Sequence, residues 1–285
     1  MMLKNLNLGM IGVKATLSES VEWARRFGFR SVDFSITEAL ALAEEMGIDG
    51  VRALFENADI FPGAWGFPIN YREDEATWRE GIMALPRQAE FALELGCTRT
   101  TTWILPGSDE RTFQENFAFH VDRLRPAAQI LADYGCRLGL EFIGPKTLRA
   151  PRTYNFIHTM DGMLALGAAI GTGNVGLLLD LFHLYTAHGS LDDMRKLQRD
   201  DIVVVHINDA PAGLAIDEQI DNQRALPGET GVMDIAGFLQ ALRDIHYDGP
   251  ITSEPFSQRV REMQPDEAVR ATSAAMDKVW QQAGL

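Results

Sequence analysis

The sequence is poor in cysteine and in long apolar runs, and each shortage argues against a class of protein. Its 285 residues contain only Cys97 and Cys136, which provide no disulfide framework and fit a reducing cytosol, so we expect a cytoplasmic protein. No segment reaches the ~20 uninterrupted apolar residues that span a bilayer, and the N-terminal MMLKNLNLGMIG lacks a signal-peptide cleavage pattern. We therefore expect no membrane partner.

Positive charge is also scarce. Lysine and arginine number 26 against 40 aspartates and glutamates, which gives a formal net charge of −14. Nucleic-acid binders normally carry a basic patch, and no run of lysine and arginine here would form one. We expect no nucleic-acid partner and interpret the acidic surface as an aid to solubility.

Strand-like and helix-like patterns alternate along the whole chain, without a low-complexity tract or a composition shift that would mark a linker. The expected strands are LNLGMIG (6–12), SVDFS (31–35), IFPGAWG (60–66), TRTTTWIL (98–105), RLGLEF (137–142), VGLLLDLFH (175–183), IVVVHIND (202–209) and PITSEPF (250–256). The expected helices lie near 16–28, 38–57 with an interruption at 47, 74–95, 110–134, 159–169, 190–198, 234–246 and 265–282. Thr16 and Glu19 form a capping box at the first of these helices.

Eight strand-then-helix units in one run predict an α/β fold, a single (β/α)8 TIM barrel over residues 1–285, with its active site at the carboxyl ends of the strands. The competing fold is a doubly wound sheet. GMIGVKA follows the first strand where the dinucleotide-binding version of that fold would carry G-x-G-x-x-G, which favours the barrel.

Four of the strand-like runs in the second half end at or near a residue that binds metal: Glu141, Asp180, His206 and Glu254. A barrel strand is covered on both faces and should be apolar, and an unpaired buried carboxylate costs several kcal/mol. Neighbouring strands lie ~4.8 Å apart, so the four side chains can reach one ion. Three oxygens and one nitrogen favour one Mn²⁺ or Mg²⁺ per chain, Mn²⁺ first, with Co²⁺ or Zn²⁺ as alternatives. A set of unrelated structural acids is the competing interpretation.

Five motifs carry a family resemblance: GLEFIG with Glu141, LLLDLFH with Asp180 and His183, VVVHIND with His206, RALPGETGVMD from Arg224, and ITSEPF with Glu254. With them the chain resembles the xylose-isomerase-like TIM-barrel superfamily. The resemblance lies in its sugar isomerase/epimerase branch, which includes ketose 3-epimerases, hydroxypyruvate isomerases, and inosose isomerases and dehydratases. The resemblance implies that Glu141 and Glu254 bind the metal and exchange the proton. It also implies that His183 and Arg224 contact substrate oxygens.

This layout predicts proton transfer beside a carbonyl, through an enediolate that the metal stabilises as a Lewis acid. Glutamates on opposite sides of the substrate would give epimerisation, return of the proton to the neighbouring carbon would give aldose–ketose isomerisation, and loss of a β-hydroxyl would give dehydration. We expect a metal-dependent isomerase or epimerase of carbohydrate metabolism. The alternative is a lyase or dehydratase acting on an oxidised sugar or inosose. The expected partner is a small sugar or polyol-ketone, and a homo-oligomer is left open.

Weaker signals each have a structural alternative. His183 could be a structural histidine, and Arg224, in the long segment 210–231, could lie at the surface rather than in an active-site lid. Trp103 could form the wall of a sugar pocket or pack in the barrel, and Lys146 could neutralise an anionic substrate group or be solvated. The remaining histidines are expected at the surface or in loops: His120, His158, His188 and His246.

An alternative from another class is a DNA-repair nuclease, because the endonuclease IV family shares this barrel and these ligand positions. Resemblance to that family would imply a three-zinc site with further histidines, including some on the third and fourth strands. Here those strands offer PGAWG and TTTWIL, without histidine, and the net charge of −14 opposes DNA binding.

Overall fold

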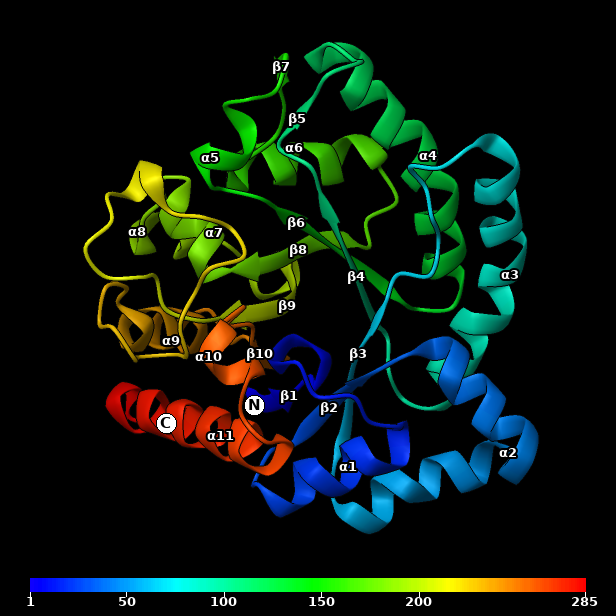
Figure 1. The fold of residues 1–285 in the computed structure, drawn as a ribbon. Helices are drawn as coiled ribbons and strands as arrows, with labels where there is room; N and C mark the ends of the chain where they lie inside the picture. Colours follow the sequence, from blue (N-terminus) through cyan, green and yellow to red (C-terminus); the bar gives the residue numbers. More distant parts are fainter.

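Eight parallel strands close into a barrel in the computed structural model, which describes residues 1–285. Their order around the barrel is β1, β2, β3, β4, β6, β8, β9 and β10, and β10 pairs back onto β1. The strands are β1 (Leu3–Leu6), β2 (Ser31–Phe34), β3 (Phe61–Gly66), β4 (Arg99–Ile104), β6 (Arg137–Phe142), β8 (Val175–Asp180), β9 (Ile202–Ile207) and β10 (Pro250–Ser253). Helices surround them (Figure 1). The (β/α)8 fold expected from the sequence is confirmed.

The long helices follow the strands in the expected order. They are α1 (Leu17–Arg26), α2 (Ile36–Ala58), α3 (Glu75–Glu94), α4 (Phe113–Asp133), α6 (Met160–Ile170), α9 (Ile235–Asp244) and α11 (Pro265–Ala283). The capping box of Thr16 and Glu19 begins α1, as predicted. Gly47, with φ 76°, interrupts α2 where the sequence indicated a break.

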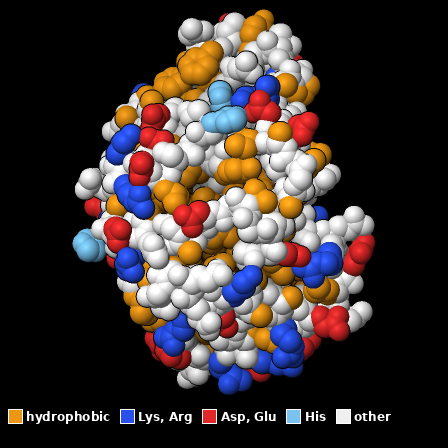
Figure 2. All heavy atoms as spheres, turned by 90° about the vertical axis from the view of Figure 1, so that its left-hand side faces the viewer, with side chains coloured by type: hydrophobic (Ala, Val, Ile, Leu, Met, Phe, Trp, Pro, Cys, Tyr) orange, Lys and Arg blue, Asp and Glu red, His pale blue; other side chains and the backbone are white.

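Short elements lie in the connections between the strands. They are the helices α5 (Lys146–Arg149), α7 (Leu181–Thr186), α8 (Leu191–Met194) and α10 (Gln258–Arg261), the 3₁₀ turns at Gly9–Ile11, Arg199–Asp201 and Ile216–Glu218, and the antiparallel pair β5 (Gly107–Ser108) and β7 (Tyr154–Asn155). On the face beside α8 and α9, hydrophobic side chains line hollows and charged side chains of both signs surround them (Figure 2). None of the helices is both long and apolar enough to cross a membrane.

Three predicted elements differ from the structure. The first strand is Leu3–Leu6 rather than 6–12, because the Leu8 carbonyl accepts bonds from two later amides and turns the chain. Strand β8 ends at Asp180, whose carboxylate accepts from the Phe182 N–H (2.6 Å) and starts α7 at once. The helix expected at 190–198 covers only Leu191–Met194. The Gln198 backbone N–H donates to the Asp201 carboxylate (2.7 Å) rather than to a carbonyl of that helix. Apolar periodicity alone does not reveal such turns.

The expectation that His120 lies at the surface or in a loop is wrong, because His120 is on α4 and its side chain is buried. Its Nδ1 lies 2.7 Å from the Asn116 carbonyl, and its ring stacks on Phe156 with centroids 5.1 Å apart. Burial lowers the pKa of His120 to about 4. The imidazole is therefore a neutral core residue.

Apolar residues fill the barrel directly below its mouth. Ala64, Leu178, Val203 and Val204 form a separate cluster drawn from β3, β8 and β9. Side chains two apart on a strand share a face. Asp180 therefore points into the barrel one layer above Leu178, and His206 does so one layer above Val204. The strand period thus places polar groups at the mouth.

Candidate metal centre

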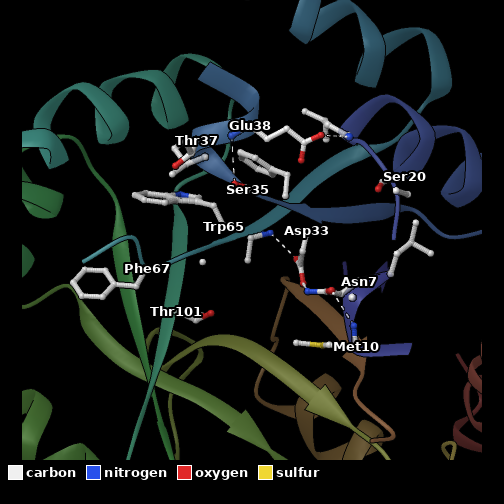
Figure 3. Close-up of a pocket in the computed structure, with 18 of the residues that line it drawn as sticks. Asn7, Met10, Ser20, Asp33, Ser35, Thr37, Glu38, Trp65, Phe67 and Thr101 are labelled. Atoms are coloured by element: carbon white, nitrogen blue, oxygen red, sulfur yellow. Dashed lines mark hydrogen bonds between the residues drawn. The ribbon is translucent and has the colours of Figure 1, made fainter. Parts of the chain in front are cut away.

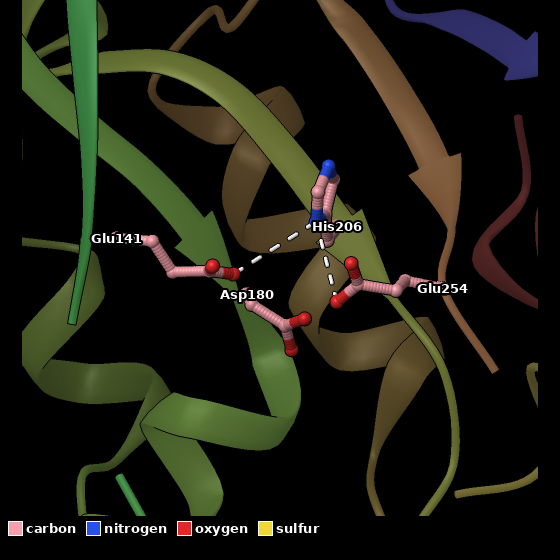
Figure 4. Close-up of side chains that lie close together, drawn as sticks. All are labelled: Glu141, Asp180, His206 and Glu254. Carbon is pink, nitrogen blue, oxygen red and sulfur yellow. Dashed lines mark ion pairs between the residues drawn. The ribbon is translucent and has the colours of Figure 1, made fainter. Parts of the chain in front are cut away.

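Four side chains converge at the carboxyl ends of four neighbouring strands. Glu141 is the penultimate residue of β6, Asp180 the last of β8, His206 the penultimate of β9, and Glu254 directly follows β10. Asp180 and His206 are paired across β8 and β9. One ligand atom from each of the four lies within 4.8 Å of the others, and all four residues are buried. Figure 4 shows Glu141 and Glu254 entering from opposite sides of the cluster.

The buried donors of this cluster suit a divalent cation. Glu141 Oε1 and His206 Nδ1 are buried without a hydrogen-bond partner. Nδ1 faces Glu141 Oε1 at 3.8 Å and Glu254 Oε2 at 3.6 Å (Figure 4). Buried polar atoms are rarely left unpaired, and oxygen with imidazole is a common ligand set for divalent metals. The group can therefore hold one divalent ion, whose identity the donors leave open.

The charges within the cluster also favour a bound cation. Burial, then the charges of Glu254 and Asp180, raise the pKa of Glu141 well above its ordinary value. Burial also opposes ionisation of Glu254, but His206 and Arg224 hold the pKa of that carboxyl below its ordinary value. Three carboxylates in so small a volume repel one another, and a cation among them relieves that repulsion.

Arg224 is buried and is not a surface arginine. Its Nη1 donates to Asp180 Oδ2 and to Glu254 Oε2, both at 2.8 Å, and its Nη2 donates to Asp221 Oδ1 at 2.8 Å. The guanidinium carbon lies 4.6 Å from the ring centroid of Phe182. Arg224 therefore lies against two of the three cluster carboxylates, and its role toward substrate stays a prediction.

His183 lies between two groups that can only donate hydrogen bonds. Its Nδ1 lies 3.2 Å from the Gly144 amide, and its Nε2 lies 3.2 Å from Arg224 Nη2. Burial and the Arg224 charge lower the pKa of His183 to about 3, which keeps the ring neutral. The carboxylate oxygens nearest to Nε2 are Asp221 Oδ1 at 3.6 Å and Glu141 Oε1 at 3.7 Å. A neutral imidazole accepts at one nitrogen only, so one of the two contacts with Gly144 and Arg224 is not a hydrogen bond.

A cavity of about 380 Å³ lies over the cluster. Its lining is Trp103, Leu105, Glu141, Ile143, Leu148, His183, Asp221, Arg224, Glu254 and Phe256. Trp103 is thus a wall of this cavity, with 45% of its surface exposed and the Arg72 guanidinium 3.9 Å from its ring. Lys146 does not line it, because its ammonium pairs with Asp217 at 2.7 Å on the exposed side of α5.

Sequence reasoning missed several residues that shape this site. Asp221 and Phe256 both line the cavity, and Phe256 has the strained φ of 36° that is rare for an aromatic residue. Asn208 Nδ2 lies 3.3 Å from both Asp180 oxygens. The only signal for Asn208 was its position two residues after His206, and nothing in the sequence indicated the other two.

Asp209 is a further buried carboxylate near the site, fully enclosed and satisfied by backbone amides. It accepts bonds from four amides, those of Ala210, Thr230, Gly231 and Met233, at 2.8–3.1 Å. Its own backbone pairs with Ala225 in both directions. Asp209 therefore holds the base of the segment 210–231, next to Arg224.

A family model described as "Xylose isomerase-like TIM barrel" matches residues 21–279. The chain belongs to this family. The resemblance carried by the five motifs is thereby confirmed, including the branch that contains inosose isomerases and ketose epimerases.

Several curated relatives are similar in sequence. An inosose isomerase from Halalkalibacterium halodurans is 23% identical over 261 residues, which cover 90% of this chain and 88% of that protein. A 3-dehydroshikimate dehydratase from Pseudomonas putida is 30% identical over 145 residues, 50% of this chain and 21% of that protein. An L-ribulose 3-epimerase from Methylomonas sp. is 28% identical over 155 residues, 54% of this chain and 46% of that protein. These relatives support an enzyme of the isomerase, epimerase or dehydratase kind.

Solved structures share the fold over the full chain. A xylose isomerase domain protein from Alicyclobacillus acidocaldarius has a TM-score of 0.89 at 29% identity and covers 100% of both chains. The IOLI protein with a bound zinc atom has a TM-score of 0.78 at 20% identity, covering 99% of this chain and 98% of that one, a likeness of fold alone.

Proposed function

We propose that the chain is a divalent-metal-dependent isomerase or epimerase of a sugar-like ketone. The observation that carries this proposal is the cluster of Glu141, Asp180, His206 and Glu254, in which two glutamates face each other across one set of ligand atoms. Inosose isomerase and L-ribulose 3-epimerase among the relatives support the reaction class.

The two glutamates would move the proton. They lie on opposite sides of the cluster, Glu141 with Oε1 free of hydrogen bonds and Glu254 with Oε2 held by Arg224 at 2.8 Å. One would take a proton from a substrate carbon on its side, and the other would deliver a proton to the opposite face. When bound, a divalent ion supplies Lewis-acid stabilisation of the negative charge that develops on neighbouring substrate oxygens.

Two further side chains would orient the substrate. His183 lines the cavity, and its Nε2 would contact a substrate oxygen, since the carboxylate oxygens of Asp221 and Glu141 lie 3.6 Å and 3.7 Å from it, beyond hydrogen-bond distance. Arg224 would hold Glu254 and Asp180 in place and, with Phe256, would enclose one side of the cavity. Trp103 would form the apolar wall across from them.

The dehydratase alternative keeps the support of the 3-dehydroshikimate dehydratases, which are 30% identical over half of the chain. Such a substrate carries a carboxylate, whereas Arg224 is the only cation that lines the cavity and two of its nitrogens are already bound by carboxylates. This disfavours a carboxylate-bearing substrate of that kind and leaves dehydration of an uncharged oxidised sugar or inosose as the alternative. The remote nuclease alternative has no support from the site, because β3 and β4 carry none of the additional histidines expected for it.

The test is to incubate Mn²⁺-loaded protein in D₂O with a panel of ketoses, inososes and hydroxypyruvate, and to follow each carbon by NMR. The proposal expects deuterium to enter at the carbon beside the carbonyl of an uncharged ketone. The Glu141→Gln variant, loaded with the same metal, is the matched control and should show no exchange. Full metal loading without exchange from any member of the panel would refute the proposal.

A further inference from the structure

An outer cavity lies beside the cavity over the cluster, between α5 and the segment 210–231. It measures about 510 Å³ and is lined by Thr147 and Leu148 of α5 and by residues 217, 218 and 220–222 of that segment. Leu148 and Asp221 line both cavities. These two side chains therefore form the wall at which the outer cavity meets the cavity over the cluster.

Residues 211–220, which we call the flap, form a compact unit of that segment. Gln219 is fully buried, and its Nε2 donates to the carbonyls of Pro211 (3.2 Å) and Leu214 (3.3 Å). The 3₁₀ turn Ile216–Glu218 lies between these residues in the chain. Because the flap is held together by its own hydrogen bonds, it can move as one piece.

Three polar contacts join the flap to elements outside the segment 210–231. Asp217 Oδ2 accepts from Lys146 Nζ at 2.7 Å, and Asp217 Oδ1 lies 2.9 Å from His188 Nε2. Thr147 Oγ1 donates to the Gln219 carbonyl at 2.8 Å. Lys146 belongs to α5 and His188 follows α7, so the carboxylate of Asp217 ties the flap to two elements at once.

The contacts of Asp217 can be released without unfolding the site. The side chains of Asp217, Lys146 and His188 are 41%, 52% and 56% exposed, and ion pairs between exposed groups hold weakly and are screened by salt. Lys146 and His188 keep the pKa of Asp217 at about 2, so the carboxylate is ionised at neutral pH. Asp221, in contrast, is held by the buried Arg224 through two bonds, at 2.7 and 2.8 Å. The flap can therefore lift from α5 while Asp221 stays with Arg224.

We infer that the flap is the gate of the substrate cavity and that the contacts of Asp217 with Lys146 and His188 keep it closed. When these contacts break, the flap lifts from α5, and the outer cavity opens past Leu148 into the cavity over the cluster. Loops that close over a site commonly control the entry of substrate and the release of product. The inference rests on the proposed function for the identity of the molecule that passes, and deepens it by naming the route and the residue that controls it.

The test places a thiol inside the cavity over the cluster and measures how fast a reagent reaches it. Ile143 is 5% exposed and lines that cavity but not the outer one. The native Cys97 and Cys136 are buried, so Ile143→Cys introduces the only accessible thiol. The probe is N-ethylmaleimide, a small uncharged reagent, and its addition is followed by mass spectrometry of the full chain. Saturating Mg²⁺ is present, because thiolates bind this ion poorly.

In the Ile143→Cys background, Asp217→Asn should speed alkylation about threefold to tenfold, the effect of losing two exposed ion pairs that favour the closed state. Lys146→Met and His188→Gln should each give part of that increase, and neither should add to it once Asp217 is replaced. About 1 M NaCl should raise the rate when Asp217 is present and leave the rate of the Asp217→Asn protein nearly unchanged, because salt screens the same contacts.

Asp266→Asn is the matched control. Asp266 is also bound by two cations, Arg26 and Arg270, each at 2.6 Å, and it is 37% exposed, but it joins α1 to α11. Its replacement should change the alkylation rate by less than about twofold. Equal effects of Asp217→Asn and Asp266→Asn, an unchanged rate in Asp217→Asn, or no alkylation in any of the proteins would overturn the inference. The measurement needs no substrate, so its failure and failure of the deuterium experiment are separate results.

Discussion

Arg224 provides the most informative perturbation, because it is a buried cation placed against two of the proposed metal ligands. Replacement by methionine keeps an unbranched apolar stem and removes the charge. Asp180 and Glu254 would each lose a 2.8 Å bond and remain buried beside Glu141. Breaking a buried ion pair by removing one partner costs about 3–5 kcal/mol. At about 2–4 °C per kcal/mol for a chain near this size, the Tm of the metal-free protein should fall by roughly 6–20 °C.

Metal should reverse much of this loss. The Arg224 charge repels a cation held by the same carboxylates, so Arg224→Met should gain more stability from saturating Mn²⁺ than the wild type gains. The assay is thermal unfolding of both proteins with and without Mn²⁺. Arg259→Met is the control, because Arg259 pairs with Glu229 at 2.6 Å while half exposed and should change the free energy of unfolding by less than about 1 kcal/mol.

Two results would refute this reasoning. One is a metal-free Arg224→Met protein that melts within the change seen for Arg259→Met. The other is an equal Mn²⁺ stabilisation of variant and wild type. Once a substrate is known, Arg224→Met should also raise KM with metal content intact, as expected of a residue that orients groups around the substrate.

The remaining predictions concern the ligands and one core histidine. His206→Ala should abolish the binding of one Mn²⁺ per chain in metal analysis, and three ions per chain or undiminished binding would exclude the single-ion centre. Glu141→Gln and Glu254→Gln should each lower kcat by orders of magnitude even at saturating Mn²⁺, whereas Asp180→Asn should be partly rescued as Mn²⁺ rises; equal rescue of all three would make the glutamates ligands only. The pKa of His120 is about 4 in the fold against 6.5 in the unfolded chain, so the unfolded chain binds the proton first and stability should fall as the pH drops from about 6.5 to 4, by about 2 kcal/mol at pH 5. Metal-free His120→Phe should lose that part of the decline in urea unfolding at pH 7 and pH 5, and an unchanged decline would assign it to other groups.

The convergence of the four cluster residues could be predicted because it depends only on strand ends. The run 137–142 was predicted as a strand and is β6 with the same bounds, and the other three runs begin where predicted. In a parallel barrel, residues at the ends of neighbouring strands must be close. No tertiary contact had to be known for Glu141, Asp180, His206 and Glu254.

Other features depend on contacts that the sequence pattern does not contain. Arg224 lies in a loop, and its inward direction follows from carboxylates on β8 and β10 that are distant in sequence. A cavity of about 680 Å³ at the carboxyl ends of β1, β2 and β3 (Figure 3) has at its base Asp33 of β2, which accepts from Asn5 of β1. His120 was misplaced because a single polar residue on an amphipathic helix does not reveal whether a carbonyl one turn earlier accepts its proton.

The amide cradle around Asp209 has a consequence for hydrogen exchange in the segment 210–231. The amides of Thr230, Gly231 and Met233 point at a fully buried carboxylate and should exchange with solvent only when the base of the segment unfolds. Gly213 lies on the exposed stretch before Arg224, its amide has no hydrogen-bond partner, and it should exchange rapidly. Asp209 and Ala225 are thus tied together by backbone, whereas the stretch between them is held to α5 by the exposed pair of Lys146 with Asp217. Substrate would enter by movement of that exposed stretch, while the Asp209 cradle keeps Arg224 in register with the cluster.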